Sequence, residues 1–335
     1  MPDASGALPA QDAAQDASTP TAPSGPFALG IDAGGSSTRW LLMASDGSIA
    51  AAGRVGPVSG IQLHDEVRAT TLARIHELLA ACQQVGRPER VVAGVTGIER
   101  GSHESALLQH AIAETLALAP SQVTVLPDIV TAYLSTFRPG AGVLVYAGTG
   151  SIALHLTAGG NVLRAGGHGY LIDDEGGGYW IGREALKRVL RRTDAAGATD
   201  DGPLARALYG ELGGSSWDHV RSVVYQGGRA RLAALTPVVA MTAARGDADA
   251  RAVLAAAGTE LARLAQVVAG RLGQVLPVAL AGGAARCGPA LVEPLRTALP
   301  AGTPFTVATR EPVEASAEFA RRLLQGSEAL PEGFA

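Results

Sequence analysis

Short apolar runs and longer helical patterns alternate along the chain in a regular order. Apolar runs bounded by turn residues predict strands, and apolar residues three or four positions apart predict helices. The first part of the chain therefore has the predicted order βββαβαβα, with Asp46-Gly47 as a tight turn between the second and third strands. These elements are strands 27–33, 37–44 and 48–55, helix 64–85, strand 90–95, helix 102–118, strand 123–127 and helix 129–137.

The same pattern then starts again. Residues 31–36 (IDAGGS) and 146–151 (YAGTGS) hold equivalent places, about 115 residues apart, which indicates an internal repeat. A stretch with only helical patterns, residues 182–274, interrupts the second copy. The remaining predicted elements are strands 142–148, 151–157, 162–167, 277–283 and 304–309, and helices 289–299 and 315–324.

The repeat predicts an α/β protein with two lobes and a cleft between them. We expect a first lobe at 26–139, which the helix at 315–325 could complete, and a second lobe at 140–325 with the helical insertion 182–274. Residues 1–25 are rich in Ala, Pro, Asp, Ser and Thr, which predicts a disordered tail and no signal peptide, and 326–335 is expected to be a second tail.

Composition narrows the possible partners. The net charge of −4 argues against nucleic acid or an anionic membrane as the main partner. The most apolar long segment, 252–285, is broken by Glu260, Arg263 and Arg271, so no membrane-spanning helix is predicted. The two cysteines, Cys82 and Cys287, form neither a disulfide framework nor a metal knuckle, which favours a reducing, cytoplasmic setting.

Each copy of the repeat has a glycine-rich turn after its first strand. The turn at 34–38 lacks the lysine of a phosphate-binding P-loop, and it leads into a strand, whereas a dinucleotide-binding loop opens a helix. Glycines at a hairpin tip allow backbone N–H groups to approach a phosphate. Asp32 beside the first turn then suggests a Mg²⁺ ion held through water between this carboxylate and nucleotide oxygens.

These motifs resemble the actin, hexokinase and Hsp70 superfamily of ATP-dependent phosphotransferases and, within it, the BadF/BadG/BcrA/BcrD ATPase family. The resemblance covers about residues 27–325 and is most specific in RAGGHGYLIDDEGGGYWIGREAL (164–186). It implies two ribonuclease-H-like, actin-like ATPase lobes that bind ATP between their turns. The implied nucleotide-binding residues are Asp32, Gly34, Gly35, Ser36, Thr38, Gly148, Thr149, Gly150, Ser151, Gly282 and Gly283.

A lone carboxylate at a strand end is the expected base for phosphoryl transfer, and Asp128 closes the strand VTVLP. Asp128 could also simply cap the helix that follows it, and both roles can hold together. The resemblance makes Asp128 the general base and places Asp174 on a sugar hydroxyl, although the run of acids at 173–175 could be a solvated turn. The residues implied to bind the sugar are Ser59, Thr96, Gly97, Asp128, Gly167, His168, Asp174 and Gly178.

The resemblance implies a sugar kinase, a homodimer in related enzymes, that transfers the γ-phosphate of ATP to the 6-hydroxyl of N-acetylglucosamine or glucosamine. Ser59 and His168 stand where related amino-sugar kinases often have Asn and Trp, so the sugar stays open. Two other functions also stay open: an ATPase that activates a partner enzyme, and a sugar-binding regulator without catalysis. The cysteines do not match the iron–sulfur arrangement of the activators, and no helix-turn-helix segment is evident.

Overall fold

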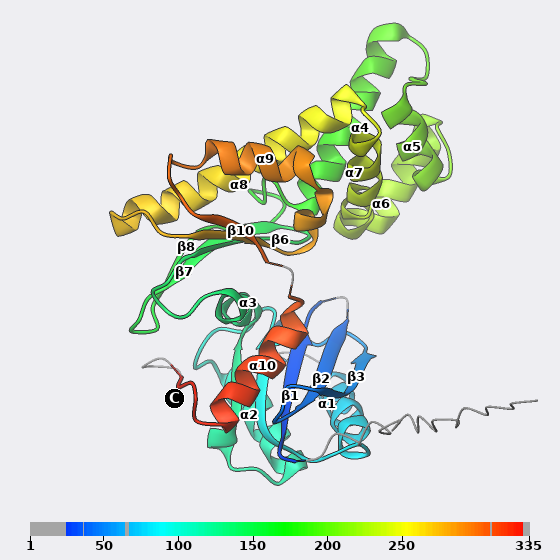
Figure 1. Ribbon diagram of the computed structural model, residues 1–335. Helices are drawn as coiled ribbons and strands as arrows, with labels where there is room; N and C mark the ends of the chain where they lie inside the picture. Colours follow the sequence, from blue (N-terminus) through cyan, green and yellow to red (C-terminus); the bar gives the residue numbers. More distant parts are fainter. Residues whose placement is uncertain (1–24, 36, 64–66, 309, 331–335) are drawn as a thin grey trace, which may run out of the picture.

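The computed structural model describes residues 25–35, 37–63, 67–308 and 310–330, which form two lobes, each built on one five-stranded sheet (Figure 1). The first sheet has the order β3-β2-β1-β4-β5. β1, β2 and β3 form an antiparallel meander, while β4 and β5 run parallel to β1. The strands are β1 (Phe27–Ala33), β2 (Thr38–Ala44), β3 (Ile49–Val55), β4 (Pro88–Val95) and β5 (Val123–Pro127).

The second sheet repeats the first strand by strand. Its order is β10-β9-β6-β7-β8, with an antiparallel meander from β6 to β8 and with β9 and β10 parallel to β6. The strands are β6 (Val143–Ala147), β7 (Ser151–Leu156), β8 (Val162–Gly166), β9 (Val278–Ala281) and β10 (Phe305–Val307). The predicted class, a duplicated α/β fold of two lobes, is therefore confirmed.

Each glycine turn closes the first hairpin of its own sheet. In the first sheet Asp32 pairs with Arg39 and Ala33 with Thr38, and in the second Ala147 pairs with Ser151. The two turns thus hold equivalent places in their sheets, although the second, 148–150, is one residue shorter than the first, 34–37. The helices of the described part of the first lobe are η1 (Ile61–Leu63), α1 (Arg68–Gln83), α2 (His103–Leu116), η2 (Pro120–Gln122) and α3 (Asp128–Thr136), joined by α10 (Pro312–Leu324) from the end of the chain. Helix α9 (Pro289–Ala298) lies between β9 and β10 and packs on α8 in the second lobe.

The insertion in the second lobe is helical, as predicted. Its helices are α4 (Gly178–Ala196), α5 (Pro203–Leu212), α6 (Trp217–Ala233), α7 (Thr236–Ala244) and α8 (Ala248–Leu272), and the short η3 (Gly283–Cys287) follows β9. Among the described residues α8 alone is long and apolar enough to cross a membrane by length and composition. Half of that stretch is buried, and α8 packs on β6, β7, β8 and α9, so its composition is explained by its place in the core.

Several predicted ends shift in the structure. The helix predicted from 64 begins at Arg68, while 64–66, with the acids expected in its first turn, lie outside the described residues. The insertion begins at Gly178, four positions before the predicted 182, because the N–H groups of Gly178 and Tyr179 donate to the second glycine turn and start α4 early. The last strand is shorter than predicted, and α10 begins at Pro312, a residue suited to the first helical position.

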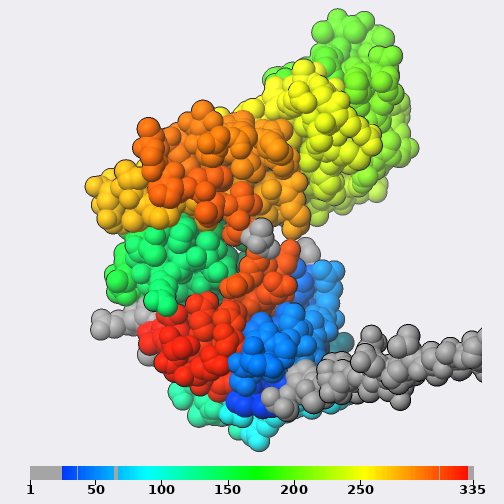
Figure 2. All heavy atoms as spheres, in the orientation of Figure 1, coloured from blue at the N-terminus to red at the C-terminus, as the bar shows by residue number. Residues whose placement is uncertain are grey.

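Helices α3 and α10 form the layer between the two sheets (Figure 1). Their buried residues join one apolar cluster with Ala28 and Val92 of the first sheet and Leu144 and Leu154 of the second. Strand β1 serves two cores because its residues alternate: Leu29 and Ile31 face the cluster of α1 and α2, and Ala28 faces α10. In Figure 2 the surface is hollowed between the lobes, on the side where β2 and β3 lie.

The packing of α10 on β1 predicts that Gly30 tolerates no side chain. A Cβ at Gly30 would lie 2.2 Å from the backbone nitrogen of Ala317. We expect Gly30→Ala to lower the free energy of unfolding by about 1–3 kcal/mol, because backbone must move to admit the methyl group. Denaturant unfolding measures this difference.

Gly210→Ala is the matched control, because a Cβ there meets nothing within 4 Å on the exposed side of α5. Helix propensity predicts that this change stabilises the protein by about 0.5–1 kcal/mol. Equal stability of wild type and Gly30→Ala would contradict the close packing of α10 on β1.

Candidate active site

The first glycine turn carries a carboxylate that is held by an arginine. Asp32 ends β1, and its Oδ2 accepts a 2.7 Å hydrogen bond from Nη2 of Arg39, its partner across the hairpin. Nη1 of the same guanidinium donates over 3.0 Å to Glu311. Arg39 was not anticipated from the sequence, although its place opposite Asp32 in a hairpin could have indicated it.

Asp128 lies deeper in the first lobe and is the first residue of α3. It accepts a 2.8 Å hydrogen bond from the backbone N–H of Ile129 and another from the hydroxyl of Thr96. Burial raises the pKa of Asp128, the two hydrogen bonds oppose that change, and the negative charge of Asp32 adds to it. Asp128 is thus the first helical residue and lies within the electrostatic reach of Asp32, whereas Pro127 is the N-cap of α3 and no side-chain capping bond forms, so the simple capping role is not supported.

The loop after β3 joins this group. The N–H of Gly60 donates over 2.9 Å to the carbonyl of Thr96, and a Cβ at Gly60 would lie 2.2 Å from the carbonyl oxygen of Gly97. This contact holds buried Ser59 beside Thr96 and Gly97. The first lobe therefore brings together four residues expected to contact sugar: Ser59, Thr96, Gly97 and Asp128.

The second glycine turn is locked to the loop that precedes α4. The N–H groups of Gly178 and Tyr179 donate to the carbonyls of Gly148 and Thr149 over 2.8 and 2.9 Å. The hydroxyl of Ser151 donates over 2.6 Å to the carbonyl of Glu175. Gly178, which was expected to contact sugar, is therefore part of the second turn's support.

Asp174 is the centre of that support. Its carboxylate is buried, accepts a 3.3 Å hydrogen bond from the N–H of Ser151, and forms a 3.5 Å ion pair with Arg229. A Cβ at Gly150 would lie 2.4 Å from this carboxylate, so only glycine fits there. Asp174 itself has a φ of 72°, and the acids at 173–175 are thus more than a solvated turn.

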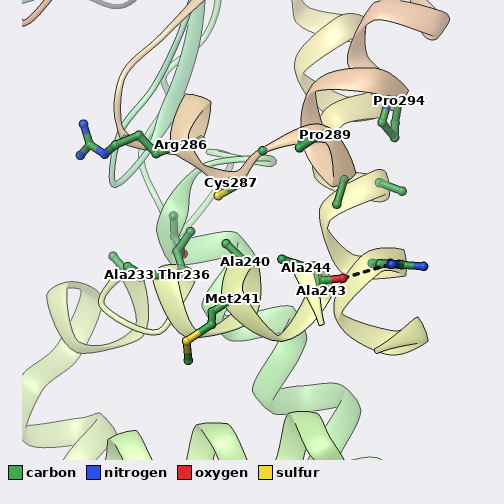
Figure 3. Close-up of a pocket in the computed structure, with 18 of the residues that line it drawn as sticks. Ala233, Thr236, Ala240, Met241, Ala243, Ala244, Arg286, Cys287, Pro289 and Pro294 are labelled. Carbon is green, nitrogen blue, oxygen red and sulfur yellow. Dashed lines mark hydrogen bonds between the residues drawn. The ribbon is translucent and has the colours of Figure 1, made fainter. Parts of the chain in front are cut away.

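A large cavity opens beside the second turn. It has a volume of about 1320 Å³ and lies between the turn, α7, η3 and the start of α9 (Figure 3). Gly148, Thr149 and Gly283, three residues expected to bind nucleotide, line it. The sequence did not reveal its other walls, which come mainly from the helical insertion and include Ala233, Thr236, Ala240, Met241, Arg286, Cys287 and Pro289.

Gly282 directly precedes Gly283, one of the residues that line this cavity. It has a φ of 92°, and a Cβ there would lie 2.6 Å from the carbonyl oxygen of Ala147. Glycine at 282 thus lets η3 approach the second turn. The cavity is largely apolar. The hydroxyl of Thr236, one of its polar groups, is already used, because it donates over 2.8 Å to the carbonyl of Gly178. Such a cavity beside glycine N–H groups suits a nucleoside and its phosphates.

Tyr146 was also missed from the sequence. It follows Val145 in β6, packs on the cluster between the lobes, and lies among the charged groups of the first turn. Burial raises the pKa of Tyr146 to about 12, and the negative charges of Asp32 and Asp128 add to this effect. The second lobe thus contributes a neutral phenol to the surroundings of the two carboxylates.

The remaining predicted residues have different positions. Gly34 and Gly35 lie at the tip of the first turn, where a Cβ at Gly35 meets nothing within 4 Å, and Ser36 lies outside the described residues. The hydroxyl of Thr38 is buried and has no hydrogen-bond partner in the part of the chain that the structure describes. Gly167 and His168 are exposed on the second lobe, and no hydrogen bond or ion pair between described residues joins them to Asp128.

Two equivalent glycine turns, a carboxylate beside the first and a nucleoside-sized cavity beside the second define an ATP-using phosphotransferase of the actin-like fold. The profile of the BadF/BadG/BcrA/BcrD ATPase family matches residues 29–300. The chain belongs to this family.

A curated relative and two solved structures similar to this chain are named as sugar kinases. The chain is 27% identical over 239 residues, 70% of this chain and 76% of the relative, to the N-acetylmuramic acid/N-acetylglucosamine kinase of Clostridium acetobutylicum. A structure from Chromobacterium violaceum, provisionally assigned as an N-acetylglucosamine kinase, is 28% identical with a TM-score of 0.63, covering 88% of this chain and 99% of that one. A glucokinase of the ROK family from Streptomyces griseus, solved with glucose and AMPPNP, shares the fold at 16% identity and a TM-score of 0.57, over 88% of this chain and 99% of its own.

The buried charge of Asp128 predicts a pH-dependent effect on stability. The pKa of Asp128 is raised on folding, so the unfolded chain loses this proton first as the pH rises, and stability falls between the two pKa values. Each unit of difference between the pKa of Asp128 in the folded and in the unfolded state corresponds to about 1.4 kcal/mol in the free energy of unfolding. We expect Asp128→Asn to melt at a higher temperature than wild type at pH 7, with the advantage shrinking toward pH 4, in thermal melts across that range. An advantage that grows toward pH 4 would contradict the raised pKa.

The contacts of Asp174 predict which substrate it affects. If it acts by holding the second turn, Asp174→Asn raises the KM for ATP by roughly tenfold, as for the loss of a charged hydrogen bond, and leaves the KM for sugar nearly unchanged. Arg229→Ala should also raise the KM for ATP. Asp218→Asn, on the exposed surface of α6, should change neither the KM for ATP nor the KM for sugar. A rise in the sugar KM alone would instead place Asp174 on the sugar, as the family resemblance implies.

Proposed function

We propose that this enzyme transfers the γ-phosphate of ATP to the 6-hydroxyl of an amino sugar such as N-acetylglucosamine or glucosamine. The coarser class, an ATP-dependent carbohydrate kinase, follows from the family and from the kinases named among its relatives. The observation that carries the proposal is the position of Asp128: a largely buried carboxylate at a helix start of the first lobe, within electrostatic reach of Asp32 and of Tyr146 from the second lobe.

Asp128 would act as the general base on the acceptor hydroxyl. Its raised pKa makes it a better proton acceptor than an ordinary carboxylate. The hydrogen bonds from Ile129 and Thr96 hold one orientation of the carboxylate toward the cleft. Thr96, Gly97 and Ser59 would form the first-lobe wall of the sugar site, while Gly167 and His168 would meet the sugar from the second lobe when the lobes close.

Asp32 would hold Mg²⁺ through water. No group of three His, Cys, Asp or Glu residues that could hold a metal ion exists among the described residues. One carboxylate at the tip of a strand, with a second nearby, suits Mg²⁺, which keeps several waters and takes its other ligands from nucleotide phosphates. The bound ion would neutralise charge on the phosphates.

Fewer residues indicate which sugar accepts the phosphate than indicate the reaction class. The Clostridium acetobutylicum relative is named for two N-acetylated sugars, N-acetylmuramic acid and N-acetylglucosamine. Ser59, which is buried beside Thr96, is smaller than the Asn of related amino-sugar kinases and leaves more room on this wall. We therefore include N-acetylmuramic acid among the candidate acceptors.

The alternative of an ATPase activator with an iron–sulfur cluster is not favoured by the cysteines. Cys82 lies in the core of the first lobe and Cys287 in that of the second. Burial raises the pKa of these thiols to about 12 and about 11, which is unfavourable for thiolate ligands.

The decisive experiment measures ADP release with glucosamine, N-acetylglucosamine, N-acetylmuramic acid, glucose and buffer alone, followed by identification of the phosphorylated carbon by NMR. We expect turnover that requires an amino sugar. Asp128→Asn should lower kcat by ~10²–10⁴-fold, the usual contribution of a general base, with nucleotide affinity within a few-fold of wild type. Turnover without sugar would favour the activator function, and a variant with most of its kcat would remove Asp128 as the base.

A further inference from the structure

A chain of four charged side chains links the two lobes at the cleft. Asp32 accepts from Arg39 over 2.7 Å, Arg39 donates to Oε2 of Glu311 over 3.0 Å, and Oε1 of Glu311 lies 3.4 Å from Arg286. Asp32 and Arg39 belong to the first sheet, and Arg286 belongs to η3 of the second lobe. One carboxylate, Glu311, therefore contacts both the residue that holds Asp32 and a residue that lines the nucleotide cavity.

Glu311 has the constrained backbone in this chain of charges. It lies where the polypeptide returns from β10 of the second lobe to α10, and its carbonyl accepts a 3.0 Å hydrogen bond from the N–H of Ala315. Pro312 follows it at the first position of the helix, which limits the backbone further. Arg286, in contrast, has a side chain that is 75% exposed and points away from the helices that carry Met241 and Pro289 in Figure 3.

The pairing of Arg39 with Asp32 conflicts with the proposed role of Asp32. A guanidinium beside this carboxylate repels a divalent cation and competes with it for the same oxygen. Asp32 can turn toward Mg²⁺ only if Arg39 gives up that bond. Glu311 offers Arg39 a second carboxylate at hydrogen-bond distance, so that Arg39 keeps a partner when Asp32 leaves.

We propose that Glu311 is a positioning residue that retains Arg39 while Asp32 is transferred to Mg²⁺ and that, through Arg286, makes this transfer responsive to occupation of the nucleotide cavity. The inference rests on the proposed magnesium role of Asp32. Nucleotide phosphates entering beside Arg286 would draw that guanidinium from Glu311, which leaves the whole carboxylate to Arg39. Metal and nucleotide would thereby favour each other's binding through one side chain.

Loss of the Glu311 charge should make magnesium harder to bind. In Glu311→Gln, Arg39 has Asp32 as its remaining carboxylate among these contacts, so Mg²⁺ must compete with a stronger ion pair. We expect the magnesium concentration for half-maximal ADP binding, measured by titration calorimetry, to rise roughly two- to fivefold, the range for a half-exposed ion pair. At saturating Mg²⁺ the ADP affinity and kcat should return to within about twofold of wild type.

Three further variants make the test specific. Glu314 also lies in the first turn of α10 and forms no ion pair with another described residue. Glu314→Gln should therefore leave the magnesium requirement unchanged. Glu311→Asp should recover part of the effect. In an Arg39→Ala background, Glu311→Gln should have no further effect on the magnesium requirement, because Glu311 acts through Arg39.

Other results would overturn the inference. Equal magnesium requirements for Glu311→Gln and Glu314→Gln would do so, as would a full effect of Glu311→Gln without Arg39. ADP binding by wild type that does not depend on Mg²⁺ would remove both this inference and the metal role of Asp32. Absence of sugar phosphorylation alongside the expected calorimetric shifts would overturn only the proposed acceptor, since ADP binding is measured without sugar.

Discussion

The arrangement of the cleft depends on how closely helix α10 approaches strand β1. At Gly30 the helix backbone comes so near that no Cβ fits, and the helix thereby lies against the middle of the first sheet. Because α10 follows the last strand of the second lobe, this contact ties the end of one lobe to the centre of the other. It also places Glu311 beside the first glycine turn and completes, with α3, the apolar layer that separates the sheets.

The ionisable groups at the cleft lie at the edge of this apolar layer, and burial there raises the pKa values of Asp128 and Tyr146. Asp128 begins α3, so its carboxylate is at the border between the buried cluster and the cleft, and burial raises its pKa. Two donors, Ile129 and Thr96, offset part of the cost of that burial. The same border brings Tyr146 of the second lobe near the charges of the first, which gives the site a low-dielectric floor made by both lobes.

The duplicated fold could be predicted because its evidence is local. Strand periodicity and the two glycine turns appear within short windows of sequence, and the matching places of IDAGGS and YAGTGS reveal the repeat. Residues on one strand and its adjoining loop, such as Asp32, Thr96 and Asp128, could be located for the same reason. Helix starts were less predictable, since α4 begins at Gly178 only because of hydrogen bonds to the second turn.

Partners from distant parts of the chain could not be predicted. Arg229 reaches Asp174 from α6, and Glu311 reaches Arg39 from a segment 272 positions away. Most walls of the large cavity beside the second turn come from the insertion, whose Ala, Pro and Met residues resemble an ordinary helical core in sequence. Such contacts depend on how helices pack around the sheet, and one sequence contains no pattern that reports them.

The two glycine turns hold equivalent places in their sheets but differ in length and in how closely the rest of the chain packs around them. Gly150 in the second turn is enclosed by Asp174 and Gly177, whereas Gly35 in the first has open space around it. The enclosed glycine of the second turn tolerates no Cβ, whereas a Cβ at Gly35 would meet no other atom within 4 Å. The duplication has thus kept a glycine hairpin in both sheets while the surroundings of the two copies have diverged. A sequence change that the first copy could accept at its tip would be sterically forbidden in the second.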